Sequence, residues 1–132
     1  MYTLYFRDSQ VASVRKDGED LRIFLSSAAV ACGKPTGQGG VDGYLAPVEL
    51  CMKQVTLSGE YELCTGRLSA GELRLRGTQG VTILRSLALP FACMGPVSLR
   101  LEFAQGSVLE LSGASLKIAL TGGERYTESY AC

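Results

Sequence analysis

The stretch VSLRLEFAQGSVLELSGASLKIAL, residues 97–120, carries an apolar side chain at almost every second position. From 97 to 103, valine, leucine and phenylalanine alternate with serine, arginine and glutamate, the period-two pattern of a strand with one face in the core. The residues AQGS at 104–107 predict a turn. The alternation resumes on both sides of Gly113, where a glycine is typical of a bulge or bend. The stretch predicts three antiparallel strands in a meander.

Two further segments have the pattern of a β-hairpin. The segment VRKDGEDLRIFL, residues 14–25, places the Asp-Gly pair 17–18 between two strand-like runs, and this pair tolerates the positive φ that tight hairpin turns require. The segment RLSAGELRLRG, residues 67–77, has an Ala-Gly pair at 70–71 between two alternating runs. We therefore expect one hairpin centred on each pair.

The remaining segments also favour strands. YLAPVELCMKQVTLSG, residues 44–59, has apolar side chains on one side of a strand and polar ones on the other. In VTILRSLALPFACMG, residues 81–95, Pro90 fits an edge strand or a kink better than a central strand. SSAAVAC, residues 26–32, is the one candidate for a short helical turn, and a buried strand fits it equally well.

About eight to ten short strands, Gly-rich turns and little or no helix predict an all-β fold. The chain of 132 residues is of single-domain size, so we expect one domain over 1–132. A single-domain antiparallel β-sandwich is the favoured architecture, and a small closed β-barrel is the alternative. The sandwich is favoured because Pro47, Pro90 and Gly113 interrupt the strands, whereas a barrel that holds a ligand needs longer and more even ones.

Composition limits the partners and the location. The formal net charge is zero, whereas proteins that bind a phosphate backbone carry excess Lys and Arg, so no specific nucleic-acid binding is expected. Arg7 and Asp8 interrupt the first apolar residues, and no later stretch approaches the roughly 18 apolar residues of a membrane helix. We expect no membrane association and a cytoplasmic location. Abundant Gly, Ala and Arg are typical of GC-rich codons, which suggests a bacterial or phage source.

The sequence contains no histidine, which removes the usual general base and the commonest transition-metal ligand. Ser-His-Asp and Cys-His nucleophile pairs therefore cannot form within the chain. The densest carboxylate group, Asp17, Glu19 and Asp20, lies in a predicted hairpin turn beside basic residues and is interpreted as solvated turn charge. We expect no enzymatic activity, no catalytic residue, no cofactor and no metal site.

The cysteines do not suggest a metal or disulfide framework. They are odd in number and form no CxxC motif. In a reducing cytosol, free cysteines behave as small buried hydrophobes, and this is the interpretation that we favour. The cysteines are Cys32, Cys51, Cys64, Cys93 and Cys132.

One predicted connection is long and rich in glycine. It is GKPTGQGGVDG, residues 33–43. The segment lacks the phosphate-binding P-loop pattern, because Pro35 stands where Ser or Thr would contact magnesium. A long connection of this kind is either a flexible loop or a loop that contacts a partner.

Arginine is concentrated in the segment 66–100. Arg74 and Arg76 share one face of a predicted strand with Glu72. This pattern indicates either a solvated outer face with weak ion pairs, or a surface for an acidic partner, because arginine binds carboxylates in a bidentate way and is enriched at interfaces. The other arginines of the segment are Arg67, Arg85 and Arg100.

Tyrosines gather near both ends of the chain. Terminal strands are often neighbours in β-sandwiches, so we expect these rings to lie close together. They would then either pack over the core with their hydroxyls at the rim, or form an aromatic interface patch. The residues concerned are Tyr2, Tyr5, Tyr126 and Tyr130, with Phe6 beside them.

These observations favour a non-catalytic protein-interaction module, such as an inhibitor, an immunity-type protein or an assembly factor, that acts through a strand face, a sheet edge or a loop. The alternative is a sandwich or barrel that binds an apolar small molecule. The partner would be a protein of unknown identity, and a free sheet edge would also permit a homo-oligomer. The candidate partner-binding residues are Arg67, Arg74, Arg76, Arg85, Tyr126 and Tyr130.

Overall fold

The structure is a computed structural model of the whole chain, and it describes residues 2–32, 41–58, 61, 63–120 and 123–128. The described residues contain eleven strands and no helix, which confirms the all-β prediction. The strands are β1 (Tyr2–Asp17), β2 (Asp20–Cys32), β3 (Gly43–Ala46), β4 (Val48–Lys53), β5 (Thr56–Ser58), β6 (Gly66–Gly77), β7 (Gly80–Leu84), β8 (Ser86–Leu89), β9 (Phe91–Phe103), β10 (Val108–Ala119) and β11 (Arg125–Glu128).

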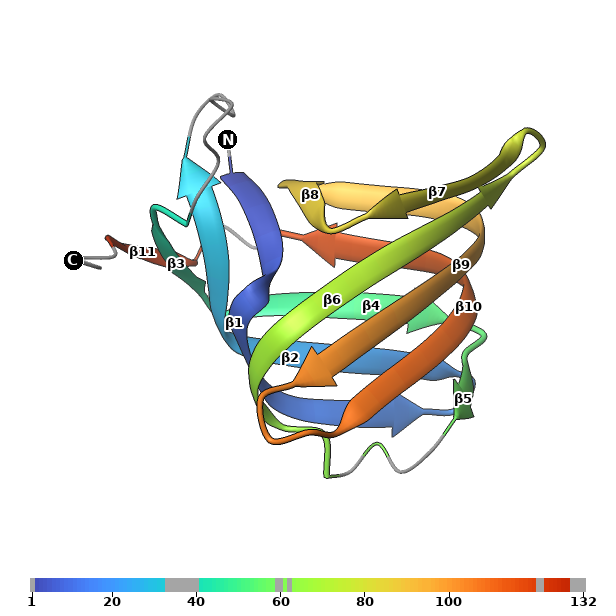
Figure 1. Cartoon of the computed structure of the whole chain (residues 1–132), viewed down its shortest axis with the longest axis horizontal. Coiled ribbons are helices and arrows are strands. Elements are labelled where there is room, and N and C mark those ends of the chain that lie inside the picture. The colour runs from blue at the N-terminus through green and yellow to red at the C-terminus, as the bar shows by residue number, and fades with distance from the viewer. Residues whose placement is uncertain (1, 33–40, 59–60, 62, 121–122, 129–132) are drawn as a thin grey trace.

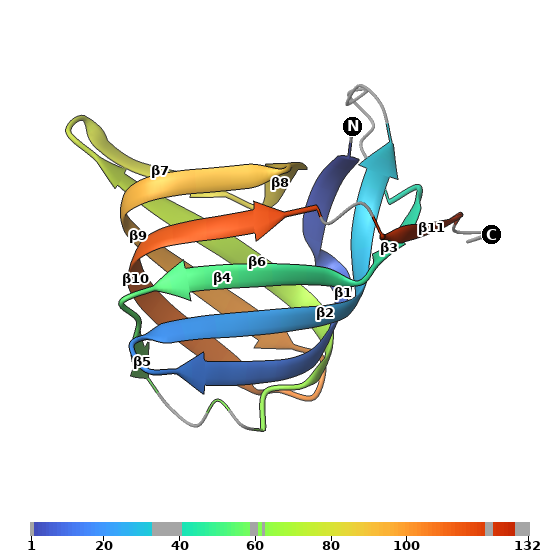
Figure 2. The same cartoon turned by 180° about the vertical axis from the view of Figure 1, so that it is seen from behind.

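The centre of the molecule is a closed antiparallel barrel (Figures 1 and 2). Six strands form the ring in the order β1, β2, β4, β10, β9 and β6, and each pairs with the next. The ring closes where Gln10 and Val11 of β1 pair with Arg67 and Gly66 of β6. The architecture is thus the predicted barrel alternative, and not the sandwich that the sequence favoured.

The remaining strands lie outside the ring. The first half of β1 and the second half of β2 leave the barrel as a pair, and β3, β11 and β8 extend this pair into a smaller sheet (Figure 1). Strand β7 pairs with the end of β6, and the resulting hairpin projects from the barrel (Figure 1). Strand β5 pairs with β10. The long strands β1 and β2 are therefore shared between two sheets.

The bend in β1 has a specific cause. Asp8 adopts a positive φ of 73°, and the β1–β2 pairing shifts its register between Tyr5 and Gln10. The buried Ser9 hydroxyl donates a hydrogen bond to the Tyr5 carbonyl at 2.7 Å and accepts one from the Ala29 N–H at 2.9 Å. The side chain thus takes the place of ladder bonds that the bend interrupts.

Apolar side chains fill the barrel interior. Alternate residues of each strand point inward, and the large side chains among them are almost fully buried. A barrel of about eight strands is just wide enough for its interior to be filled by side chains, so a six-stranded one is narrower still. The interior residues include Leu21, Ile23, Leu50, Met52, Leu73, Leu99, Leu101, Leu109, Leu111 and Ile118.

Several local predictions can be compared with the strands. The hairpin at 17–18 is confirmed, with Gly18 at a φ of 64° between paired Asp17 and Asp20. The segment 26–32 is a buried strand and not a helical turn. The prediction of a hairpin at 70–71 is wrong, because β6 continues through Gly71 and the chain turns after Gly77.

The stretch 97–120 forms two strands and not three. Strand β9 begins before it at Phe91, and β10 continues through Gly113 with a register shift between Gly113 and Ser115. The predicted bulge is therefore confirmed, but the strand on each side of it is the same strand. A Cβ at Gly113 would lie 2.6 Å from Cγ of Met52, so the glycine allows close packing at this point.

No helix in the described part of the chain has the length and the apolar character that crossing a bilayer would require.

Candidate functional site

A window interrupts the barrel wall between β1 and β6. On the edge of β6 that faces β1, residues 68–72 lie between the segment paired with β1 and the segment paired with β7, and they have no strand neighbour among the described residues. On β1, residues 6–9 lie in the same way between the segments paired with β8 and β6. The bend at Asp8 and Ser9 produces this gap, because it turns the first half of β1 away from β6.

Phe6 closes the window from the inside. Its side chain is buried, and a Cβ built on Gly71 would lie 2.5 Å from Cβ of Phe6 and 3.1 Å from Cδ2 of Leu101. Only a residue without a side chain leaves room for the phenyl group here. The window is therefore a pocket on the outer surface, with the barrel core behind it.

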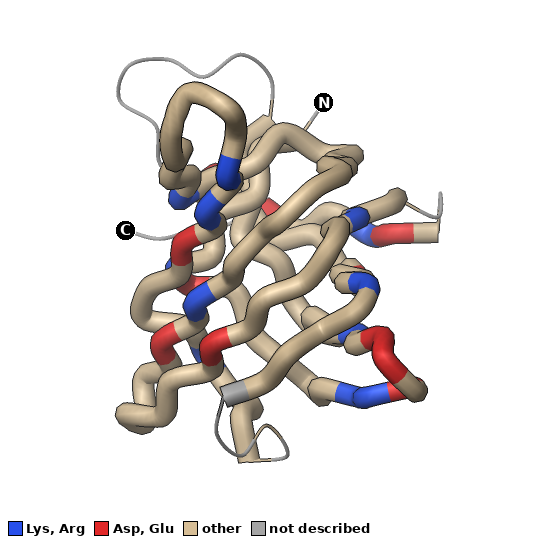
Figure 3. The backbone as a smooth tube through the Cα atoms, turned by 90° about the vertical axis from the view of Figure 1, so that its right-hand side faces the viewer, with Lys and Arg blue, Asp and Glu red and all other residues tan. Residues whose placement is uncertain are grey.

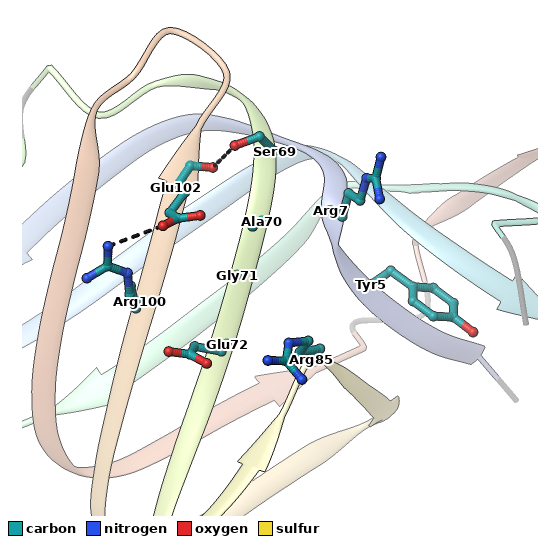
Figure 4. Close-up of a pocket in the computed structure, with 9 residues that line it drawn as sticks. All are labelled: Tyr5, Arg7, Ser69, Ala70, Gly71, Glu72, Arg85, Arg100 and Glu102. Atoms are coloured by element: carbon teal, nitrogen blue, oxygen red, sulfur yellow. Dashed lines mark hydrogen bonds and ion pairs between the residues drawn. The ribbon is translucent and has the colours of Figure 1, made fainter.

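The pocket has a volume of about 500 Å³, and five of its nine lining residues are charged. Figure 4 shows its charged residues: Arg7 on β1, Arg85 at the junction of β7 and β8, and Arg100, Glu72 and Glu102 from β9 and β6. Tyr5, Ser69, Ala70 and Gly71 complete the lining.

The carboxylates of the pocket already have arginine partners. Glu72 accepts a hydrogen bond from Arg74 at 2.9 Å. Glu102 accepts one from Arg100 at 3.2 Å, and Arg100 also pairs with Glu110. The hydrogen bond to Glu102, followed by nearby carboxylate charge, raises the pKa of Arg100, which therefore stays charged.

Arg7 and Arg85, the other two arginines of the lining, have no carboxylate partner of this kind in the described part of the chain. Both are exposed, and neither forms an ion pair with any residue in the described part of the chain. The sequence analysis did not include Arg7 among the binding candidates, because it searched for a concentration of arginine and found one in the segment 66–100. The alternation of Tyr5, Phe6 and Arg7 was the available signal, since it places Tyr5 and Arg7 together on the face opposite the buried ring.

A ladder of charge crosses the outer face of β6, β9 and β10. Arg100 lies opposite Glu72 on one side and Glu110 on the other. Viewed from this side, basic and acidic residues alternate down the surface (Figure 3). The excess of arginine along 66–100 is thus largely offset by Glu102 of β9 and Glu110 of β10, which the fold brings onto the same face as β6.

The β6–β7 hairpin carries two of the four arginines that were predicted to bind a partner. Arg74 lies opposite Ile83, and Arg76 lies opposite Val81. We call these four residues the hairpin face. Val81 and Ile83 are 57% and 47% exposed, so the hairpin face presents two apolar side chains to solvent beside the two arginines. Next to this face, a groove of about 270 Å³ is lined by Arg74, Arg76, Val81 and residues of β9 and β10.

Arg67 lies apart from this surface. It is at the start of β6, where the barrel closes, and its guanidinium Nη1 is 3.9 Å from Oδ1 of Asp8. Arg85 faces the window and does not belong to the hairpin face. The four predicted arginines therefore divide among three places: Arg74 and Arg76 on the hairpin, Arg85 at the window, and Arg67 at the closure.

The predicted aromatic cluster is found in part. The rings of Tyr2 and Tyr126 have centroids 5.9 Å apart and are tilted by 35°. Tyr5 instead lines the window, and Tyr130 lies outside the described residues. A hydrogen bond with Cys32, together with partial burial and nearby negative charge, raises the pKa of Tyr126 to about 12.

Four cysteines lie in the described part of the chain. Cys64 is buried, Cys51 and Cys93 are half-buried and Cys32 is exposed. Burial raises the pKa of Cys64 and of Cys93, which favours the unreactive thiol form. The described residues hold no cluster of Cys, Asp and Glu that could bind a metal ion.

The predicted Gly-rich loop 33–43 cannot be assessed over most of its length, because 33–40 lie outside the described residues. Its last residues are anchored to β2. The N–H of Asp42 donates to the Val30 carbonyl, and the Asp42 carboxylate accepts a hydrogen bond from the Cys32 N–H at 2.9 Å.

No family model, curated protein or solved structure matches this chain.

Proposed function

We propose that the protein is a non-catalytic, cytoplasmic interaction module that binds an acidic protein partner on the hairpin face. The observation that carries this proposal is the pairing of Arg74 and Arg76 with the exposed side chains of Ile83 and Val81. Interfaces commonly combine apolar contact with arginine, and arginine holds carboxylates through bidentate hydrogen bonds.

The free edge of β7 supports the same proposal. Its sequence, GVTIL, contains no charge and no proline, and β6 is its one strand neighbour among the described residues. Exposed apolar edge strands are liable to aggregate unless something covers them. A partner that adds an extended strand along β7 would satisfy this edge and bring its side chains over the hairpin face.

The charge pattern favours an acidic partner. Arg74 forms an ion pair with Glu72, whereas Arg76 has no ion pair within the described part of the chain. Arg76 also lies near the tip of the hairpin, which projects from the barrel and is accessible to a second protein (Figure 1). The absence of histidine from the sequence supports a non-catalytic role, because the common acid–base and nucleophile pairs cannot form.

The experiment is affinity capture followed by measurement with purified proteins. The tagged wild-type protein should capture a specific partner from a lysate of the source organism, and the purified pair should bind in isothermal titration calorimetry. The double variant Arg74→Glu with Arg76→Glu should weaken binding by more than about tenfold, because like charges then face each other. The control is Arg15→Glu with Arg125→Glu, which makes the same charge change on β1 and β11, away from the hairpin.

Two outcomes would overturn the proposal. One is a partner whose affinity is unchanged by the double variant. The other is a homodimer in light scattering that Ile83→Lys dissociates, since this would assign the hairpin face to a second copy of the chain. Circular dichroism of each variant checks that the barrel is retained.

A further inference from the structure

We propose that the window between β1 and β6 binds an oxyanion group, a carboxylate or a phosphate, of a small ligand through Arg7 and Arg85. This site is separate from the hairpin face and does not rest on the function proposed above. The protein would then bind a small molecule at a place other than the hairpin face.

The shape of the window selects a small ligand. The window is closed at both ends. At one end β1 pairs with β6 through Gln10 and Val11, and at the other end the β7–β8 junction at Arg85 connects a strand paired with β6 to a strand paired with β1. An added strand needs an open edge, so this gap cannot accept an extended peptide. Its volume of about 500 Å³ instead lies within the usual range of small-molecule pockets.

The charges select an anion. Glu72 and Glu102 are paired with Arg74 and Arg100, so they leave little free negative charge in the pocket. Arg7 and Arg85 are the cations of the lining that have no counterion among the described residues. They belong to different elements, β1 and the β7–β8 junction, and both line the pocket (Figure 4). Guanidinium groups bind carboxylate and phosphate oxygens through paired N–H donors.

The window wall favours close approach of a ligand. Ala70 and Gly71 supply a section of wall with almost no side chain. In an antiparallel strand, alternate residues direct their N–H and C=O groups to one edge. Because residues 68–72 lack a strand neighbour on this edge, some of these backbone groups face the window and are available for hydrogen bonds.

The experiment is a nuclear magnetic resonance titration of the ¹⁵N-labelled full chain with inorganic phosphate and, separately, with acetate. Sodium chloride at matched ionic strength is the reference for each. We expect saturable shifts of the amide signals of residues 5–9, 69–72 and 85 with one or both anions. A response to phosphate alone assigns the site to phosphate ligands, and a response to acetate alone assigns it to carboxylate ligands.

The variants Arg7→Gln and Arg85→Gln should each raise the dissociation constant by about tenfold, as expected for the loss of one charged hydrogen-bonding partner. Arg125→Gln on β11 and Arg76→Gln on the hairpin are matched controls that should leave it unchanged. The amide spectrum of each variant without anion shows whether it is folded. The proposal is overturned if chloride produces the same shifts, if no shift saturates, or if both window variants bind as the wild type does.

Discussion

The Ser9 hydroxyl bridges two strands: its oxygen lies 2.7 Å from the Tyr5 carbonyl oxygen of β1 and 2.9 Å from the Ala29 nitrogen of β2. The side chain is fully buried, so water cannot replace either hydrogen bond. It holds the bend that turns the first half of β1 away from β6. These two hydrogen bonds therefore help to fix the geometry of the window.

Replacement of Ser9 by alanine should lower the free energy of unfolding by about 1–3 kcal/mol, because the buried Ala29 N–H and the Tyr5 carbonyl lose their partner. Urea denaturation monitored by circular dichroism measures this change. Ser26→Ala, an exposed position of β2, is the control and should change stability by less than about 0.5 kcal/mol. Equal stability of the two variants would contradict the bridging role.

Gly71 and Phe6 provide a second test of the window. A methyl group at Gly71 would overlap the Phe6 side chain, whose Cβ and Cγ lie 2.5 Å and 2.8 Å from the added carbon. Gly71→Ala should therefore destabilise the protein by about 1–3 kcal/mol, the usual cost of overpacking a core. Thermal unfolding of the purified variant measures the loss.

Gly77→Ala is the matched control for this substitution, because the nearest atom to its added carbon is 3.9 Å away. Both positions lie on β6, and neither glycine has a positive φ. If the two variants were equally destabilised, the cost would come from the strand itself and not from contact with Phe6.

The same two residues show what the sequence could and could not predict. Alternation identifies strands and their inward faces, and the inward residues of β9 and β10 are buried as the pattern indicates. Alternation cannot tell why a glycine interrupts a run. Gly71 resembles a turn residue in sequence, but its role is to make room for Phe6, which is 65 positions distant in the chain.

The sequence favoured a sandwich over a barrel for a related reason. Pro47 and Pro90 stand between strands, and Gly113 forms a bulge within one, so the long strands remain continuous enough to close a ring. The window was not predictable, because non-local strand pairing brings Arg7 and Arg85 into the lining of one pocket. Local charge counts likewise omitted Glu110, the carboxylate of β10 that pairs with Arg100.

Asp20 and Lys53 predict a dependence of stability on pH. Lys53 Nζ donates to Oδ2 of Asp20 at 2.8 Å, and this hydrogen bond is the main cause that lowers the pKa of Asp20 and raises that of Lys53. A lowered carboxyl pKa stabilises the fold at pH values above the ordinary 3.8 and loses this effect as the pH falls. A raised ammonium pKa stabilises it below 10.5 and loses this effect as the pH rises.

Lys53→Gln should accordingly raise the pKa of Asp20 towards its ordinary value, as measured by the pH dependence of its carboxyl carbon signal. Urea denaturation between pH 3 and 7 should also show a smaller loss of stability in acid than in the wild type. Lys117→Gln removes an exposed lysine of β10 and should leave the Asp20 titration unchanged. An Asp20 pKa that is the same in the wild type and in Lys53→Gln would exclude this ion pair in solution.

Cys32, at the end of β2, is the main influence on the pKa of Tyr126 in β11, and this influence should be visible in the tyrosine titration. The hydrogen bond with Cys32 is the largest cause that raises the pKa of Tyr126 to about 12, and the electrostatic effect of Cys32 adds to it. Cys32→Ala removes both effects, so the Tyr126 pKa should fall towards 10.0, its ordinary value. The pH dependence of the ring carbon signals of labelled tyrosine measures this shift.

The control is Cys51→Ala, on β4, which should leave the Tyr126 pKa unchanged. An unchanged Tyr126 pKa in Cys32→Ala would contradict the influence of Cys32 on this ring, which also lies beside Tyr2 in a tilted arrangement.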